Sequence, residues 1–284
     1  MLIRNLKGRR SILWLSLAFA ILLSWSLSCI SSHELAHILI NSYEENHPIP
    51  VLSDKYHNLN ILEAYRVQKR YVQYRLKNDC VAGFKAGLTS QKSREKFNID
   101  SPVMGVLFTS GKHREKATIN KSVFKALMIE TELGFVVGQS ITHPLYDVSH
   151  LRQRIRAIIP VIELPDLGFE DMKNLKGVDI IAANVASAQF IIGDERDIKG
   201  LDPNNIVVTL TRDGKNFNIG KGNDVLGDQW YAALWLVNTV INQGWNIEPN
   251  HIIITGALGE MIPGKTGRYQ ADFGNLGKIH FSID

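Results

Sequence analysis

The sequence predicts an α+β fold, with a helical N-terminal part followed by a body built on a mixed β-sheet that carries one long amphipathic helix. Before residue 80, apolar residues recur at helical spacing in two stretches. After it, short apolar runs bounded by Gly, Pro, Asn and Asp are typical of strands. The chain has 284 residues, of which 45% are apolar, so it can bury one large core or two small ones.

The first predicted helix lies in SSHELAHILINSYEE, residues 31–45. A serine at its start can cap it, and Leu35, Ile38 and Leu39 share one face. The prolines of HPIPVLSD end this helix. The second helix lies in NLNILEAYRVQKRYVQYRLKN, residues 58–78. Its apolar positions at roughly helical spacing are Leu62, Tyr65, Val67, Tyr71, Val72 and Leu76.

Seven apolar runs predict the strands of the body. They span residues 80–88, 126–138, 157–164, 178–193, 205–220, 251–259 and 269–283. Within the fifth run, Asp213 and Gly214 lie between two alternating stretches and predict a β-hairpin.

One later segment, GDQWYAALWLVNTVINQGW, has helical instead of strand periodicity. Asp228 can cap its start, and Gly244 can end it. Between them, Leu234, Val237 and Ile241 form one apolar stripe. We therefore expect one long amphipathic helix that packs on the sheet.

Residues 1–29 have the composition of an export signal or a membrane anchor. Four basic residues and no acid precede an uncharged, mostly apolar run that ends at Cys29. The run is long enough to span a bilayer. SLSC is similar to a lipoprotein cleavage site, and GRRSIL to a twin-arginine signal. We expect an exported protein, in the periplasm or anchored to the membrane through residues 11–29; a buried N-terminal helix is the alternative.

The net charge of +4 comes from this same segment, which holds four of the 32 basic residues and no acid. The rest of the chain has 28 basic and 28 acidic residues. A balanced body disfavours a nucleic-acid partner. The basic stretch with Arg152, Arg154 and Arg156 is interpreted as a solvated helix face. Cys80 would be alone in the body, which excludes an internal disulfide, and it is interpreted as a small core residue.

The segment KALMIETELGFVVG places two acidic residues, Glu130 and Glu132, inside a predicted strand. Alternate residues of a strand share a face, so both carboxylates project the same way, with Cα atoms about 7 Å apart. Burying two like charges is costly unless something compensates them. Three interpretations stay open: an exposed pair, a buried basic partner, or a divalent cation such as Mg²⁺, Mn²⁺ or Ca²⁺.

Two further charged residues lie in apolar surroundings. Glu163 is an acid within AIIPVIELPDLG. Since Mg²⁺ usually keeps water or substrate in part of its coordination shell, three carboxylates would leave positions open for chemistry. Lys85 lies between the glycines of AGFKAGLTS, which let the backbone approach a ligand closely. A partly desolvated lysine can transfer protons near neutral pH, whereas a surface strand residue is the alternative.

Six segments, in this order, resemble the 2-keto-4-pentenoate hydratase branch of the fumarylacetoacetate hydrolase superfamily, which includes 2-oxohepta-4-ene-1,7-dioate hydratases and 4-oxalocrotonate decarboxylases. They are GFKAGLTS, GVLF, IETELGFVV, PVIELPD, GKGNDVLGDQWYAALWLVN and IIITGALGEMIPGKTGRYQADFGNLGKIHFS. The resemblance begins near residue 55 and runs to residue 284. It implies a mixed β-roll of the fumarylacetoacetase C-terminal type for the catalytic domain, residues 80–284, preceded by a helical region, residues 30–79.

The resemblance also implies roles for seven site residues. The ligands of a Mg²⁺ or Mn²⁺ ion would be Glu130, Glu132 and Glu163. Lys85 would be the residue that transfers the proton. The backbone of Gly256, Ala257 and Leu258 would bind the substrate. The implied protein is a metal-dependent hydratase of a small 2-oxo acid such as 2-hydroxypenta-2,4-dienoate. It would form a homo-oligomer and, like the family, could be cytoplasmic instead of exported. The alternatives are a decarboxylase or an acylpyruvate C–C hydrolase on the same metal cage, and a non-catalytic, envelope-anchored 2-oxo acid binding protein.

Three positions depart from the family pattern. Val103 replaces an acid in IDSPVMG, and in AANVA Ala183 replaces an aspartate and Ala186 a serine. The resemblance assigns such groups to the positioning or protonation of substrate and water. Their replacement weakens the expectation of a hydration step, whereas the three glutamates and the lysine are retained.

Overall fold

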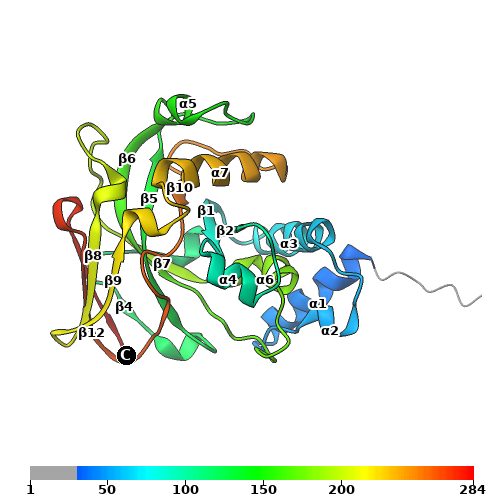
Figure 1. Ribbon diagram of the computed structural model, residues 1–284. Helices are drawn as coiled ribbons and strands as arrows, with labels where there is room; N and C mark the ends of the chain where they lie inside the picture. Colours follow the sequence, from blue (N-terminus) through cyan, green and yellow to red (C-terminus); the bar gives the residue numbers. More distant parts are fainter. Residues whose placement is uncertain (1–30) are drawn as a thin grey trace, which may run out of the picture.

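A computed structural model describes residues 31–284 of the chain (Figure 1). The predicted export or anchor segment, residues 1–29, lies outside this range. Within residues 31–284, no helix combines the length and apolar character needed to cross a bilayer.

The N-terminal part is helical, as predicted. Its helices are α1 (Ser32–Glu44), α2 (Leu52–Lys55) and α3 (Ile61–Arg75). The Ser31 hydroxyl caps α1 by accepting the Glu34 N–H, and the Asn60 side chain caps α3 by accepting the Glu63 N–H. Leu62, expected on the buried face of α3, is 59% exposed. The buried faces of α1 and α3 belong to the same hydrophobic core as the sheet residues.

The body contains two sheets. The larger has eight strands: β1 (Val81–Gly87), β2 (Val103–Phe108), β3 (Lys112–Arg114), β5 (Met128–Val137), β6 (Ile155–Leu164), β7 (Gln189–Ile192), β10 (Ile252–Ile254) and β11 (Ile262–Pro263). The smaller has five: β4 (Thr118–Ile119), β8 (Val207–Arg212), β9 (Lys215–Lys221), β12 (Gly267–Asp272) and β13 (Lys278–Ile283).

The larger sheet runs β2-β1-β10-β5-β6-β7-β3, with β11 paired to β5, and the smaller runs β4-β13-β12-β8-β9. Both are mixed, because β1 pairs in parallel with β10 and β13 with β4, while most other neighbours are antiparallel. The remaining helices are α4 (Gln91–Lys96), α5 (Val148–Arg152), α6 (Gly177–Ala182) and α7 (Gln229–Asn242). Figure 1 shows α1, α3, α6 and α7 on one side of the molecule and β8, β9 and β12 on the other. The predicted α+β class is confirmed.

Turn and cap signals located two elements well. Asp213 and Gly214 join β8 to β9 and both have positive φ, 49° and 78°, as a tight hairpin turn requires. Asp228 caps α7 by accepting the Tyr231 N–H. In α7, Leu236, Val237 and Val240 are fully buried. Of the predicted stripe, Leu234 and Ile241 are only partly buried, so the buried face differs slightly from the predicted one.

Four further predictions are wrong. The run 269–283 is not one strand, because a turn at Gly274–Leu276 separates β12 from β13, which pair with each other. The run 178–193 is not one strand: its first part forms α6, whose buried Asp179 carboxylate accepts hydrogen bonds from Ser53 and the Lys176 N–H, and only β7 is extended. The basic stretch is not a helix face, since α5 ends at Arg152 and Arg156 lies on β6, where it pairs with Glu195. Cys80 is exposed and not a core residue. The buried strand β2 and the short helix α4 were not predicted from periodicity.

Candidate active site

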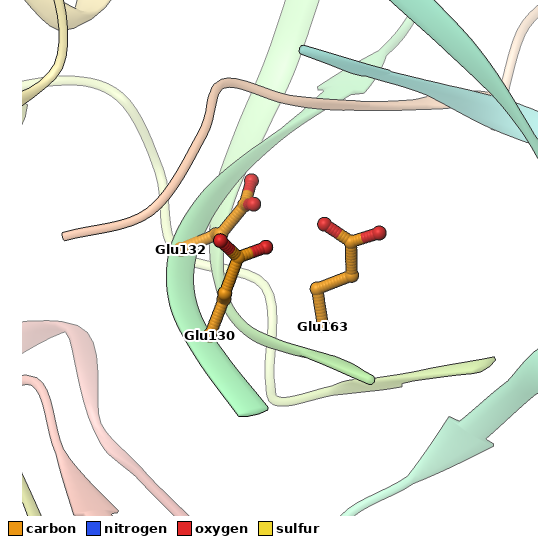
Figure 2. A group of neighbouring side chains, drawn as sticks. All are labelled: Glu130, Glu132 and Glu163. Carbon is orange, nitrogen blue, oxygen red and sulfur yellow. The ribbon is translucent and has the colours of Figure 1, made fainter. Parts of the chain in front are cut away.

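Three glutamates converge where β5 and β6 lie side by side. Glu130 and Glu132 project from the same face of β5, and Glu163 lies directly opposite Glu130 on β6. One carboxylate oxygen of each residue lies within 4.8 Å of the others. Figure 2 shows the three side chains directed into one space. Glu132 and Glu163 are buried and Glu130 is half-buried, so the exposed-pair interpretation is excluded.

The charges of this cluster are only partly balanced within residues 31–284, where one ammonium, that of Lys85, pairs with Glu163. Burial, together with repulsion from Glu163, raises the pKa of Glu130 to about 8, and burial with the same repulsion raises the pKa of Glu132 well above its usual value. Glu132 Oε1 and Glu163 Oε2 are buried and, among residues 31–284, have no hydrogen-bond donor. Buried acceptors are rarely left unpaired. Orphaned oxygens in an all-carboxylate set fit a hard divalent cation, which prefers oxygen ligands.

Lys85 lies on β1 next to this cluster. It is 3% exposed, so the surface alternative is wrong. Its ammonium forms an ion pair with Glu163 and donates a hydrogen bond to the Val185 carbonyl at 3.0 Å. Burial alone would lower the pKa of Lys85, but the nearby glutamates, Glu163 first, outweigh it and raise the pKa above its usual value. The structure therefore places a charged ammonium beside the carboxylate cluster.

The segment after β10 closes one side of the cluster. The Gly256 N–H donates to Glu132 Oε2 at 2.8 Å. Gly256 has φ of 116°, and a Cβ there would lie 2.6 Å from the Thr89 side chain, so only glycine fits. The buried Thr255 hydroxyl donates to the Gln229 side chain, which in turn donates to the Gly222 carbonyl. The role of Gln229, at the start of α7, in holding Thr255 in place was not predicted from the sequence. A polar residue directly after the helix cap is the sequence feature that could have indicated this role.

A cavity of about 460 Å³ opens onto the site. Lys85 and Glu130 line it, together with Gly256 and Ala257. The third predicted substrate-binding residue, Leu258, is fully buried and does not line the cavity. Other lining residues include the apolar Phe97, Leu167 and Ile180 and the polar Thr89, Ser90 and Lys92. The volume suits a small molecule with a short carbon chain.

No protein-family model matches the sequence. The chain is 29% identical over 254 residues to a 2-keto-4-pentenoate hydratase of Paraburkholderia xenovorans, which covers 88% of this chain and 94% of that protein. It is 27% identical over 254 residues to a 2-oxo-hept-4-ene-1,7-dioate hydratase of Escherichia coli, covering 86% of this chain and 95% of that protein. The chain is a homologue of the 2-keto-4-pentenoate hydratases.

A solved structure agrees with this relationship to the 2-keto-4-pentenoate hydratases. The 4-oxalocrotonate decarboxylase of Pseudomonas putida G7, complexed with magnesium and adipate, has the same fold, with a TM-score of 0.83 over 89% of this chain and 97% of that chain at 22% identity. The same enzyme is also known complexed with calcium and acetate. The predicted resemblance to the 2-keto-4-pentenoate hydratases and the predicted fold are confirmed.

The three departures from the expected pattern differ in position, and of the three only Ala186 lines the cavity beside Lys85. Val103 is fully buried in β2. Ala183 lines a second cavity of about 310 Å³, and Ala186 lines both this cavity and the one beside Lys85. Ala186 therefore presents a methyl group to both cavities, at the position where the family resemblance implies a serine hydroxyl.

Proposed function

We propose that the protein is a metal-dependent hydro-lyase that acts on a small 2-oxo or 2-hydroxydienoic acid such as 2-hydroxypenta-2,4-dienoate. The observation that carries this proposal is the convergence of three glutamates and one buried ammonium beside a small-molecule cavity, which Glu130 and Lys85 line. Homologues that are hydratases, matched over 86% or more of this chain, support the reaction class.

Glu130, Glu132 and Glu163 would hold the cation, Mg²⁺ or Mn²⁺, which supplies positive charge that stabilises an enolate of the substrate. Lys85 has three N–H donors, of which two are occupied by Glu163 and the Val185 carbonyl. The third has no acceptor among the described residues, so it could donate a proton to the carbon chain of the substrate as water adds across the 4,5 double bond. The backbone of Gly256 and Ala257 borders the space that the substrate would fill.

Decarboxylation is the second candidate, because the same enolate can receive the electrons released as CO₂ leaves. Two observations favour it. The fold matches a 4-oxalocrotonate decarboxylase with a TM-score of 0.83. Ala183 and Ala186 also lack the polar groups that the resemblance assigns to the handling of water. The carboxylate cluster and Lys85 serve either reaction.

The two reactions are separated by adding Mg²⁺ and either 2-hydroxypenta-2,4-dienoate or 4-oxalocrotonate to the purified full chain. We expect the dienol absorbance to decay, to stop decaying after chelation with EDTA, and to decay again with excess Mg²⁺. Release of CO₂ from 4-oxalocrotonate without hydration of the dienoate would instead assign the decarboxylase. Calorimetric binding of both acids with turnover of neither would identify a non-catalytic binding protein.

We propose in addition that residues 1–29 direct export of the protein. The support is compositional: basic residues, then an uncharged apolar run that ends at Cys29. Fractionation of cells that express the full chain should place it in the envelope, whereas a chain lacking residues 1–29 should stay in the cytoplasm. Recovery of both chains in the cytoplasm would contradict the export prediction and favour the cytoplasmic alternative.

A further inference from the structure

The turn that follows α6 has an unusual backbone. Asn184, Val185 and Ala186 have φ of 55°, 54° and 53° in succession. L-residues rarely adopt this left-handed conformation, and a β-branched residue such as Val185 does so least readily. The turn is buried, and its Val185 carbonyl accepts the hydrogen bond from Lys85 Nζ. The conformation of this turn therefore determines where one of the two partners of the lysine lies.

The Asn184 side chain fastens this turn to the sheet. It is 1% exposed, and its amide forms two hydrogen bonds with one residue of β2: the Val106 N–H donates to Oδ1 at 2.8 Å, and Nδ2 donates to the Val106 carbonyl at 2.9 Å. The neighbouring residue, Gly105, pairs with Lys85 in the sheet. The side chain thus acts as a strand neighbour would, and it ties the turn to the strand beside the lysine.

Two glycines allow the turn to approach the lysine closely. A Cβ at Gly105 would lie 2.9 Å from the Asn184 carbonyl oxygen and 3.1 Å from Lys85 Cγ. A Cβ at Gly87 would lie 2.5 Å from a methyl group of Val185. The turn is therefore enclosed by β1 and β2, and it has no room to shift without moving the Val185 carbonyl relative to the lysine ammonium.

We infer that Asn184 is a positioning residue: its side chain docks the left-handed turn on β2, so that the Val185 carbonyl and Glu163 together direct the Lys85 ammonium toward the cavity. Asn184 does not line that cavity, whereas Val185 does, so its influence passes through the turn. This inference rests on the proposed function, in which Lys85 transfers the proton.

The test compares Asn184→Gly with a matched control. Glycine tolerates the left-handed backbone but removes the amide. Asn238 on α7 makes the same two-bond contact with the backbone of Leu145, at 2.7 and 2.9 Å, and lines neither cavity. Because a small displacement of a catalytic group costs about 10²-fold in rate, we expect Asn184→Gly to lower kcat by about that factor with KM little changed, and Asn238→Ala to lower it by less than about threefold.

A second measurement does not depend on turnover. Acetylation of lysine amines in the full-length protein, followed by mass spectrometry, should modify Lys85 faster in Asn184→Gly than in the wild type, with Lys69 as the internal reference. Calorimetric Mg²⁺ affinity should stay near the wild-type value.

The inference is overturned if Lys85 is acetylated at the wild-type rate in Asn184→Gly, or if kcat falls no further than in Asn238→Ala. Should Asn184→Gly not accumulate as folded protein, Asn184→Asp replaces it; this variant keeps the acceptor for the Val106 N–H, loses the donor, and should show the same two changes to a smaller degree. If the wild type turns over neither acid, the proposed function fails, and the acetylation rates still decide whether Asn184 positions the lysine.

Discussion

Replacement of Lys85 by methionine is expected to lower kcat by about 10³-fold, because it removes the proton-transferring group while keeping a side chain of similar length. Lys85 is 3% exposed and its ammonium pairs with Glu163, so it would compete with a bound cation for the same carboxylate. Removing this positive charge should leave the Mg²⁺ affinity unchanged or make it tighter. Steady-state kinetics and calorimetry with Mg²⁺ measure the two effects separately.

Lys69 provides the matched control. Its ammonium also donates to backbone carbonyls, those of Gln243 at 3.1 Å and Gly244 at 3.3 Å, but it lies on α3 and lines neither cavity. Lys69→Met should therefore retain kcat within about threefold. Wild-type kcat in Lys85→Met would reject the role assigned to this lysine, and a parallel loss of Mg²⁺ binding would show that the substitution had disturbed the carboxylates instead.

The carboxylate pair on β5 could be predicted because it depends only on local geometry. Strand alternation places Glu130 and Glu132 on one face wherever the strand lies in the fold. The position of Glu163 opposite Glu130 depends on the β5–β6 register, which pairs residues 33 positions apart in the sequence, and no local pattern specifies it. The acid within an apolar run suggested Glu163, and the resemblance supplied its role.

The region after residue 176 was mispredicted for a physical reason. The run VDIIAA is apolar except for Asp179, and five of the six residues of α6, that aspartate included, are buried, so periodicity cannot separate a short buried helix from a strand. Asn184 follows this run, and its function depends on a contact with Val106 on β2 and on a left-handed backbone. Neither feature is visible in the sequence of a single chain.

The carboxylate cluster also makes the metal-free protein less stable as the pH rises, and a bound metal ion should offset this loss. Burial raises the pKa of Glu130 from 4.5 to about 8, so between these values the folded state binds more protons than the unfolded state. The resulting stabilisation is full below about pH 4.5 and is lost as the pH rises through about 8. The metal-free protein should therefore unfold at a lower temperature as the pH rises, and Mg²⁺ should restore the loss because it binds only the folded state.

Glu132→Gln is expected to weaken Mg²⁺ binding by at least about 10²-fold and to abolish turnover with it. Glutamine keeps an acceptor for the Gly256 N–H but carries no charge, so the metal-free variant should be more stable than the wild type at about pH 9 and should lose less stability between about pH 5 and that value. Unfolding temperatures with EDTA and with Mg²⁺ measure both effects.

Glu170→Gln is the control for this substitution, because that glutamate also accepts a backbone N–H, from Val51, but lies apart from the cluster. It should bind Mg²⁺ and respond to pH as the wild type does. The opposite signs of the two effects of Glu132→Gln, weaker metal binding with a more stable metal-free fold, follow only if repulsion among the three carboxylates is relieved by a cation. Unchanged Mg²⁺ affinity, or a metal-free variant less stable than the wild type at about pH 9, would show that the cluster is not a cation site.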